Sequence, residues 1–225
     1  MPVLYKVPFE LDEREIMRRQ EINKSSRIQP SLNNITRELI KNKDLWLEPA
    51  LAYNIFPVAE VRPFDIILQN GQMLHLSHAT AKLKQASEIA ILICTIGPLL
   101  EKAVDEHFKS GQSMKGFLLD GLGSAAVDSL AGKACDLINS DAVSRGLSSS
   151  SPYSPGMHGW SIGNLPDLFR LVPADQIGMS LTSSRMISPR KSVAMAIGIG
   201  KEMEQRKPEE MCLLCSLRDS CRHRR

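Results

Sequence analysis

The sequence has little that would mark a membrane, secreted or nucleic-acid-binding protein. Aromatic residues make up only 5% of the 225 positions, too few for the stacked rings with which proteins hold single-stranded nucleic acid. No apolar run approaches the roughly 20 residues that a membrane-spanning helix needs. The first five residues lack the basic and then apolar pattern of a secretion signal. We therefore expect a cytoplasmic protein with no membrane partner.

Net charge is also almost absent, and its small excess is local. The 28 basic and 25 acidic side chains leave a formal charge of +3. Residues 216–225 hold four arginines against one aspartate, a local +3 that equals the whole excess. A nucleic-acid-binding domain needs a basic face, and a neutral body with a basic tip does not provide one. We therefore expect no nucleic-acid partner.

Cysteines are few, but three of the five lie within or just before that basic segment. Cys94 and Cys135 lie in the body, whereas Cys212, Cys215 and Cys221 crowd near the end of the chain. An odd number without a secretion signal argues against a disulfide framework. Thiolates at this spacing suit zinc or an iron–sulfur cluster, and the neighbouring arginines favour the thiolate form. We expect the three tail cysteines to be metal ligands.

The fourth ligand of such a site stays open on the residues alone. His223 is nearest in sequence, and Cys94 or Cys135 could serve if the tail folds back onto the body. Two other interpretations remain, a redox dithiol with a spare thiol and an unligated tail. The change of composition divides the chain into a main domain over residues 1–205 and a basic, cysteine-rich, metal-binding tail over residues 206–225.

Hydrophobic periodicity predicts helices and hairpins rather than alternating strand–helix units, hence an α+β fold. Asn70-Gly71 between two extended segments predicts a β-hairpin with a type I′ turn. The apolar run from Ile89 to Ile96 predicts a strand covered on both faces. The other expected strands are 50–61, 177–182 and 192–199, and the expected helices are 10–22, 31–40, 77–85, 98–110, 112–145 and 165–171.

Two further segments have more than one interpretation. Gly121-Leu122-Gly123 begins a G-x-G-x-x-A match to a dinucleotide-binding fingerprint. Apolar residues keep helical spacing through these glycines and no βαβ pattern surrounds them, which favours a helix packed closely on another element. Residues 146–164 are rich in serine and glycine and predict a linker or functional loop, in which residues 148–151 form a flexible polar run.

Four segments of the last third succeed one another in an order that resembles a known family. They are Tyr153-Ser-Pro155-Gly156-Met157, Leu168-Phe169-Arg-Leu171, Ile177 to Ser184, and Pro189 to Ala194. This succession is similar to the activation (reactivation) domain of cobalamin-dependent methionine synthase, and more closely to stand-alone activation-domain-like proteins of anaerobes. The resemblance implies that residues 1–205 form one C-shaped α+β domain, a bent antiparallel sheet with flanking helices.

The resemblance also implies a function in methionine biosynthesis. The family's domain sits over the corrinoid of an inactivated cob(II)alamin module, binds S-adenosylmethionine and supports reductive remethylation of the cobalt. The expected partner is a corrinoid protein or methionine synthase, which carries the cobalamin, and nothing in the sequence indicates an oligomeric state. An iron–sulfur cluster in the tail would supply the electron. The cofactor-binding residues implied for this chain are Tyr153, Pro155, Gly156, Met157, Ser184 and Arg190.

The chain departs from the family at three positions of the S-adenosylmethionine site. In the family's Arg-Pro-x-x-Gly-Tyr loop, the arginine falls on Pro152 and the tyrosine on Met157, and the acid of Leu-Thr-Glu-Ser becomes Ser183. A carboxylate without a fixed guanidinium loses a strong contact. The alternative function is therefore a non-catalytic module that binds a corrinoid protein, with a structural metal in the tail. The cations that could replace the arginine are Arg185, Arg190 and Lys191.

Overall fold

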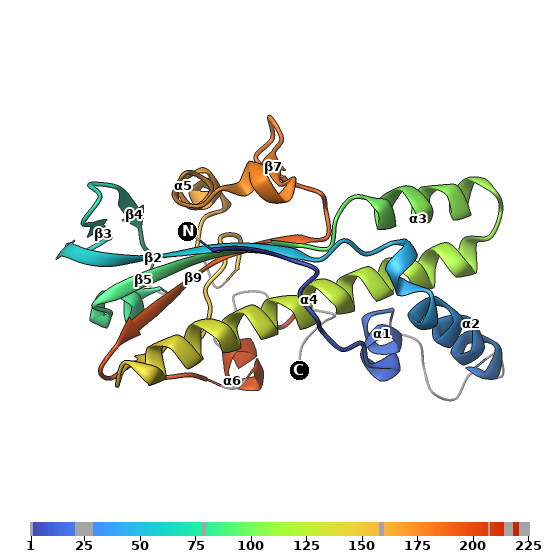
Figure 1. The fold of residues 1–225 in the computed structure, drawn as a ribbon, viewed down its shortest axis with the longest axis horizontal. Helices are drawn as coiled ribbons and strands as arrows, with labels where there is room; N and C mark the ends of the chain where they lie inside the picture. Colours follow the sequence, from blue (N-terminus) through green and yellow to red (C-terminus); the bar gives the residue numbers. More distant parts are fainter. Residues whose placement is uncertain are drawn as a thin grey trace.

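A curled, seven-stranded antiparallel sheet forms the centre of the protein (Figure 1). The computed structural model describes residues 2–20, 29–77, 80–157, 160–206, 208–213 and 218–220. The strand order is β4-β3-β2-β5-β9-β6, and β1 pairs with β2 at the end that β3 leaves free. The strands are β1 (Val3–Tyr5), β2 (Ala50–Val61), β3 (Asp65–Leu68), β4 (Met73–His75), β5 (Glu88–Thr95), β6 (Ser148–Ser149) and β9 (Ser192–Gly200), with a separate hairpin of β7 (Ser180–Leu181) and β8 (Ile187–Ser188).

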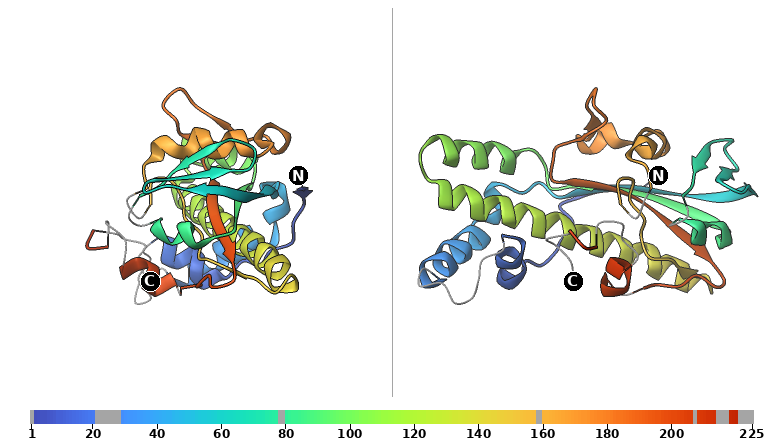
Figure 2. Two further views of the ribbon diagram at one scale, coloured as in Figure 1. Left: turned by 90° about the vertical axis from the view of Figure 1, so that its left-hand side faces the viewer. Right: turned by 180° about the vertical axis from the view of Figure 1, so that it is seen from behind.

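Helices and short turns cover the two faces of this sheet unequally. The helix α4 crosses one face, with α1 and α2 beyond it, and α5 and β7 lie over the opposite face (Figures 1 and 2). No helix among the described residues is long and apolar enough to cross a membrane. The helices are α1 (Glu13–Arg19), α2 (Gln29–Lys41), α3 (Leu99–Lys109), α4 (Ser113–Ser144), α5 (Leu165–Leu171) and α6 (Pro208–Leu213), and the 3-10 turns are η1 (Lys43–Leu45), η2 (Ala81–Gln85), η3 (Ile162–Asn164) and η4 (Ala174–Ile177).

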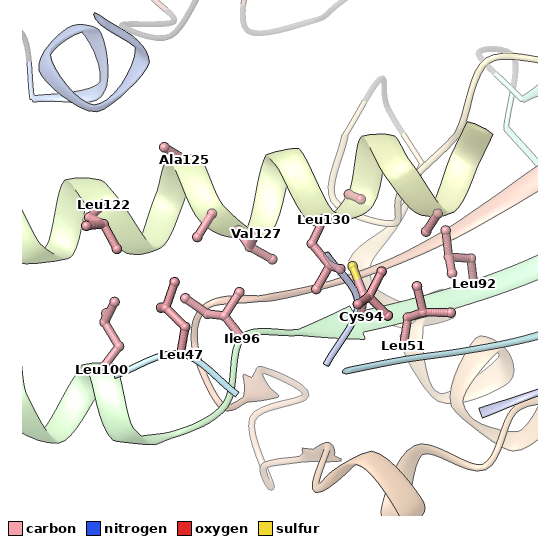
Figure 3. Close-up of a cluster of buried hydrophobic side chains, with 14 of the residues drawn as sticks. Leu47, Leu51, Leu92, Cys94, Ile96, Leu100, Leu122, Ala125, Val127 and Leu130 are labelled. Atoms are coloured by element: carbon pink, nitrogen blue, oxygen red, sulfur yellow. The ribbon is translucent and has the colours of Figure 1, made fainter. Parts of the chain in front are cut away.

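The strand β5 lies at the middle of the fold and divides the core into two layers. Successive side chains of a strand point to opposite faces of a sheet. Leu92 and Cys94 therefore pack toward α4, and Cys94 lies beside Leu130 of that helix (Figure 3), whereas Ile91 and Ile93 pack toward α5. Because both faces are covered, β5 is an unbroken apolar run, as predicted within one residue at each end.

The glycines of α4 let this helix approach its neighbours closely. A Cβ on Gly121 would stand 2.5 Å from Nε2 of Gln20, and a Cβ on Gly123 would stand 2.7 Å from Cδ2 of Leu100. The helix runs without a break through both glycines. A dinucleotide fingerprint instead needs a strand-to-helix turn that leaves backbone N–H groups free. The structure thus confirms the closely packed helix and rules out the nucleotide-binding interpretation.

The predicted β-hairpin is present, but its turn differs from the prediction. A type I′ turn requires positive φ at both central residues. Only Gly71 has one, at +82°, and Asn70 does not. Leu68 donates its N–H to Gln72 O at 2.9 Å, which makes a three-residue loop closed by the left-handed glycine. The hydrogen bond of the Asn70 side-chain oxygen with the Gln72 N–H, 3.0 Å long, stabilises this alternative.

Other boundaries differ by a few residues. The predicted strand 177–182 is reduced to β7, because η4 occupies residues up to Ile177. The helix expected from Ser31 begins at Gln29, with Pro30 in its first turn, where the missing proline N–H costs nothing. Residues 21–28 and 78–79, at the ends of two predicted helices, lie outside the described residues.

Candidate functional site

The serine run at 148–151 holds the long loop to the edge of the sheet. The Ser150 N–H donates to Gly198 O at 2.8 Å, and its Oγ accepts from the Gly198 N–H at 2.9 Å. The Oγ of Ser151 accepts from the Arg206 N–H at 2.7 Å, and both serines are buried. The expectation of a flexible run is therefore wrong, because these hydroxyls satisfy backbone groups that a regular edge strand would otherwise pair.

Tyr153 and Pro155 fix the next part of the loop on the sheet. The backbone N–H and C=O of Tyr153 pair with those of Ala196 in β9, at 2.9 and 2.8 Å. Tyr153 is only 6% exposed, and this burial raises the pKa of its hydroxyl. Pro155 is buried as well. These two predicted binding residues thus anchor the loop rather than face solvent.

Gly156 and Met157 turn the loop outward. Gly156 has φ of +90°, a conformation that strains any residue with a side chain, and it donates its N–H to Trp160 O at 2.7 Å. The indole N–H of Trp160 donates in turn to the backbone oxygen of His75, also at 2.7 Å, which ties the loop to β4. Met157 is 51% exposed. No sequence pattern points to Trp160 as a residue of this loop, because its hydrogen-bond partner His75 lies 85 residues away.

The turn between β7 and β8 reaches the same loop. The Arg185 side chain extends over Gly163, where its Nη1 lies 3.4 Å from the position of a Cβ on that glycine. The neighbouring Ile162 packs against Gly156, at 3.9 Å from a Cβ on it. The structure therefore brings two distant segments together, the loop that contains Gly156 and the turn that contains Ser184. We call the surface where they meet the loop surface, comprising Gly156, Met157, Ile162, Gly163, Ser184, Arg185 and Met186.

Arg190, also a predicted binding residue, contacts α3 instead. Its Nε lies 3.3 Å from a carboxylate oxygen of Glu101 and its Nη2 lies 3.8 Å from one of Asp105. The Arg190 backbone N–H donates to the same Glu101 carboxylate. The next residue, Lys191, lies 2.8 Å from a carboxylate oxygen of Asp120 in α4. Both cations thus brace the start of β9 against the helices.

The predicted metal ligands are described only in part. Cys212 lies on α6 and is partly buried, whereas Cys215 and Cys221 lie outside the described residues. The Arg18 guanidinium, whose pKa is raised mainly by its hydrogen bond to Glu15, also interacts electrostatically with Cys212. Across the part of the chain that the structure describes, no three histidine, cysteine or acidic side chains form a metal site.

The two body cysteines lie in the core rather than near a surface site. Cys94 is fully buried between β5 and α4 (Figure 3), and burial raises the pKa of its thiol far above the ordinary range. Burial also raises the pKa of Cys135 to about 12, and its Sγ lies 3.6 Å from the sulfur of Met195. Burial of this kind favours the protonated form of both thiols at neutral pH.

A cavity of about 370 Å³ opens on the α4 side of the sheet, away from the loop surface. It lies between α4 and the segment that leads into α1. Lys133 lines it together with several acids, so its field favours a cationic partner over an anionic one. The carboxylates of this lining are Glu10, Asp12, Glu15, Asp128 and Asp136.

Comparison with known proteins identifies the fold. No protein-family model matches the chain, and no curated protein matches it. Among solved structures, it matches the crystal structure of the MetH reactivation domain bound to AdoHcy, with a TM-score of 0.66 and 14% sequence identity. The match covers 91% of this chain and 80% of that chain. The chain therefore has the fold of the MetH reactivation domain, which confirms the predicted α+β class with a bent antiparallel sheet and flanking helices.

Proposed function

We propose that this chain binds S-adenosylmethionine and AdoHcy and acts in the reductive activation of a corrinoid protein. One electron reduces the cob(II)alamin of the partner, and methyl transfer from S-adenosylmethionine then leaves methylcobalamin and AdoHcy. The reduction is uphill at cellular potentials, and the irreversible methyl transfer pulls it forward. The chain's part is to hold the sulfonium donor and to dock over the partner's corrinoid.

The shared fold carries this proposal. It extends over 91% of the chain, and the matching domain is bound to AdoHcy. The segments that carry the sequence resemblance, 153–157 and 177–184, converge on the loop surface, where Arg185 extends over Gly163. The helix α5 and the β7–β8 hairpin lie on the face of the sheet opposite α4 (Figure 2), and Met157 and Met186 of the loop surface are 51% and 56% exposed.

A non-catalytic module is the second candidate, and the departures from the family support it. Pro152 and Met157 stand where the family has arginine and tyrosine, and both are exposed. In this candidate the chain binds a corrinoid protein without S-adenosylmethionine, and the tail holds a structural zinc ion.

The cysteine tail would supply the electron in the catalytic candidate. Arg18 interacts electrostatically with Cys212, and cysteine sulfurs are the usual ligands of an iron–sulfur cluster. Purification without oxygen, followed by iron, sulfide and zinc analysis, tests this part separately. Zinc alone, or no metal, would rule out the electron-donor role and leave the binding of S-adenosylmethionine open to the next experiment.

Calorimetric titration with AdoHcy tests the proposed function. We expect saturable binding, and a Met157→Glu variant should weaken it by about tenfold or more, because the ligand would desolvate a new carboxylate. Met114→Glu is the matched control on α4, since Met114 is 44% exposed against 51% for Met157. It should bind AdoHcy as the unsubstituted protein does. The absence of heat up to millimolar AdoHcy would favour the non-catalytic module.

A corrinoid partner gives the second readout. We expect anaerobic affinity capture with the whole chain to retain a protein with the visible spectrum of a bound corrinoid. Added S-adenosylmethionine and a one-electron reductant should then convert that spectrum to the methylated form. Capture with no such conversion would support the module, and failure to retain any corrinoid protein would contradict both candidates.

A further inference from the structure

The amino-acid end of AdoHcy needs a cation for its carboxylate, and the sequence has no cation at the position where the resemblance places one. Its carboxylate is best held by a guanidinium in fixed geometry, through two parallel charge-assisted hydrogen bonds. Pro152 stands where the resemblance places that arginine. If the chain binds AdoHcy as proposed above, another cation must take this part.

Two of the three nearby cations are already paired with carboxylates. Arg190 contacts Glu101 and Asp105, and Lys191 contacts Asp120, all of them on the helical side of the sheet. The backbone N–H groups of Arg190 and Lys191 also donate to Glu101, which fixes this segment on α3. Recruiting either cation would break these contacts and leave acidic side chains without their partners.

Arg185 differs from both in its surroundings. Its guanidinium has no hydrogen bond or ion pair with any residue that the structure describes. Its backbone has φ of +62°, an uncommon conformation for a residue with a long side chain, and its N–H donates to Thr182 O at 2.9 Å. That bond closes the β7–β8 turn, so the turn sets the direction in which Arg185 leaves the backbone.

The position of Arg185 also fits the other end of the ligand. Its Nη1 lies beside Gly163, and Ile162 connects that point to Gly156, where the loop turns outward. Met157, Ile162 and Met186 are 51%, 45% and 56% exposed. Met157 follows Gly156, Ile162 precedes Gly163 and Met186 follows Arg185, so exposed apolar residues adjoin the points at which the two segments meet. An apolar border with a single guanidinium suits a ligand that has a thioether and an adenosine at one end and a carboxylate at the other.

We infer that Arg185 is the residue that binds the carboxylate of AdoHcy and S-adenosylmethionine, in place of the arginine missing at position 152. The thioether and the adenosine lie over the apolar border formed by Met157, Ile162 and Met186. This assignment rests on the proposed function, and it names which of the three cations serves the ligand. It also explains why loss of the arginine at Pro152 is compatible with binding.

Paired ligands separate this role from a structural one. AdoHcy carries the amino-acid carboxylate, whereas 5′-deoxy-5′-methylthioadenosine has the same adenosine and a thioether but no amino acid. We expect Arg185→Ala to weaken AdoHcy binding by about 10- to 100-fold, the range of a charged hydrogen bond, and to change methylthioadenosine binding less than about twofold. Arg185→Lys should give an intermediate loss, since lysine keeps the charge but not the planar fork.

Control variants distinguish a failure of this inference from a failure of the proposed function. Arg62→Ala removes an exposed arginine that pairs with Glu60 on the far part of the sheet, and it should leave both affinities unchanged. Equal losses for the two ligands would show that Arg185 acts by shaping the loop, and a selective loss in Arg190→Ala would assign the carboxylate to that residue. Either result overturns the inference alone. If the unsubstituted protein binds neither ligand, the proposed function falls and the inference with it.

Discussion

The two faces of the central sheet are built from different kinds of elements. One face is covered by a single 32-residue helix, α4, with α1, α2 and α3 around it. The other is covered by the β7–β8 hairpin and by α5 and two 3-10 turns, of which no helix or turn is longer than seven residues. A long helix closes its face by continuous apolar contact. Short elements leave side chains such as Met157 and Arg185 at the surface, so the second face is the one that can recognise a ligand.

The largest expected effects come from replacing one buried leucine on each face of the sheet. Leu130 of α4 and Leu168 of α5 are both fully buried. Replacement of either by alanine should lower the free energy of unfolding by about 2–5 kcal/mol, as measured by urea titration. Only Leu168→Ala should also weaken AdoHcy binding in the folded protein, because α5 follows directly on η3 of the loop surface. Equal weakening by both variants would mean that the faces do not act separately.

As the pH rises, the first loss of stability should come from a buried thiol on the α4 face. The pKa of Cys135 is about 12 in the folded protein against an ordinary value of 9.0, so the unfolded chain loses this proton first. The contribution of Cys135 to stability is therefore fully present below about pH 9 and falls as the pH rises from there, by about 1.4 kcal/mol at pH 10. Urea titrations at pH 7 and pH 10 should show a smaller decline in Cys135→Ala. On the loop side, Tyr153→Phe tests the raised pKa of Tyr153 in the same way, at higher pH.

The smallest expected effects come from replacing one glycine on each face by alanine. Gly132 lies in α4 with no atom within 4 Å of a Cβ, so Gly132→Ala should stabilise the protein by about 1 kcal/mol through helix propensity. Gly156 has φ of +90°, so Gly156→Ala should destabilise it by about 1–2 kcal/mol. Thermal unfolding should show shifts of opposite sign, roughly 2–4 °C per kcal/mol. Shifts of the same sign would contradict the assigned backbone conformations.

Elements with local signals were predictable from the sequence. The periodicity of residues 165–171 gave both ends of α5, and the apolar run at 89–96 gave β5 within one residue. These succeed because helix and strand repeats are properties of neighbouring residues. The turn type at Asn70-Gly71 was wrong, since a side-chain hydrogen bond to Gln72 decides between two turns that the same dipeptide allows.

The candidate site was predictable only in part, because its residues come from segments that meet across the fold. The resemblance pointed to Gly156 and Ser184, and the structure brings their segments together. It also pointed to Arg190, whose partner Glu101 lies 89 residues earlier in the chain. The composition of the serine run predicts a flexible segment, because its hydrogen-bond partners, Gly198 and Arg206, lie 48 and 55 residues farther along the chain.

The sequence by itself determined the α+β class and most elements, because composition and periodicity are local properties. The tertiary structure decided which cation is free. Arg185, Arg190 and Lys191 have the same charge and lie within seven positions of one another. Only the packing of α3 and α4 against the start of β9 occupies two of them and leaves Arg185 on the loop surface.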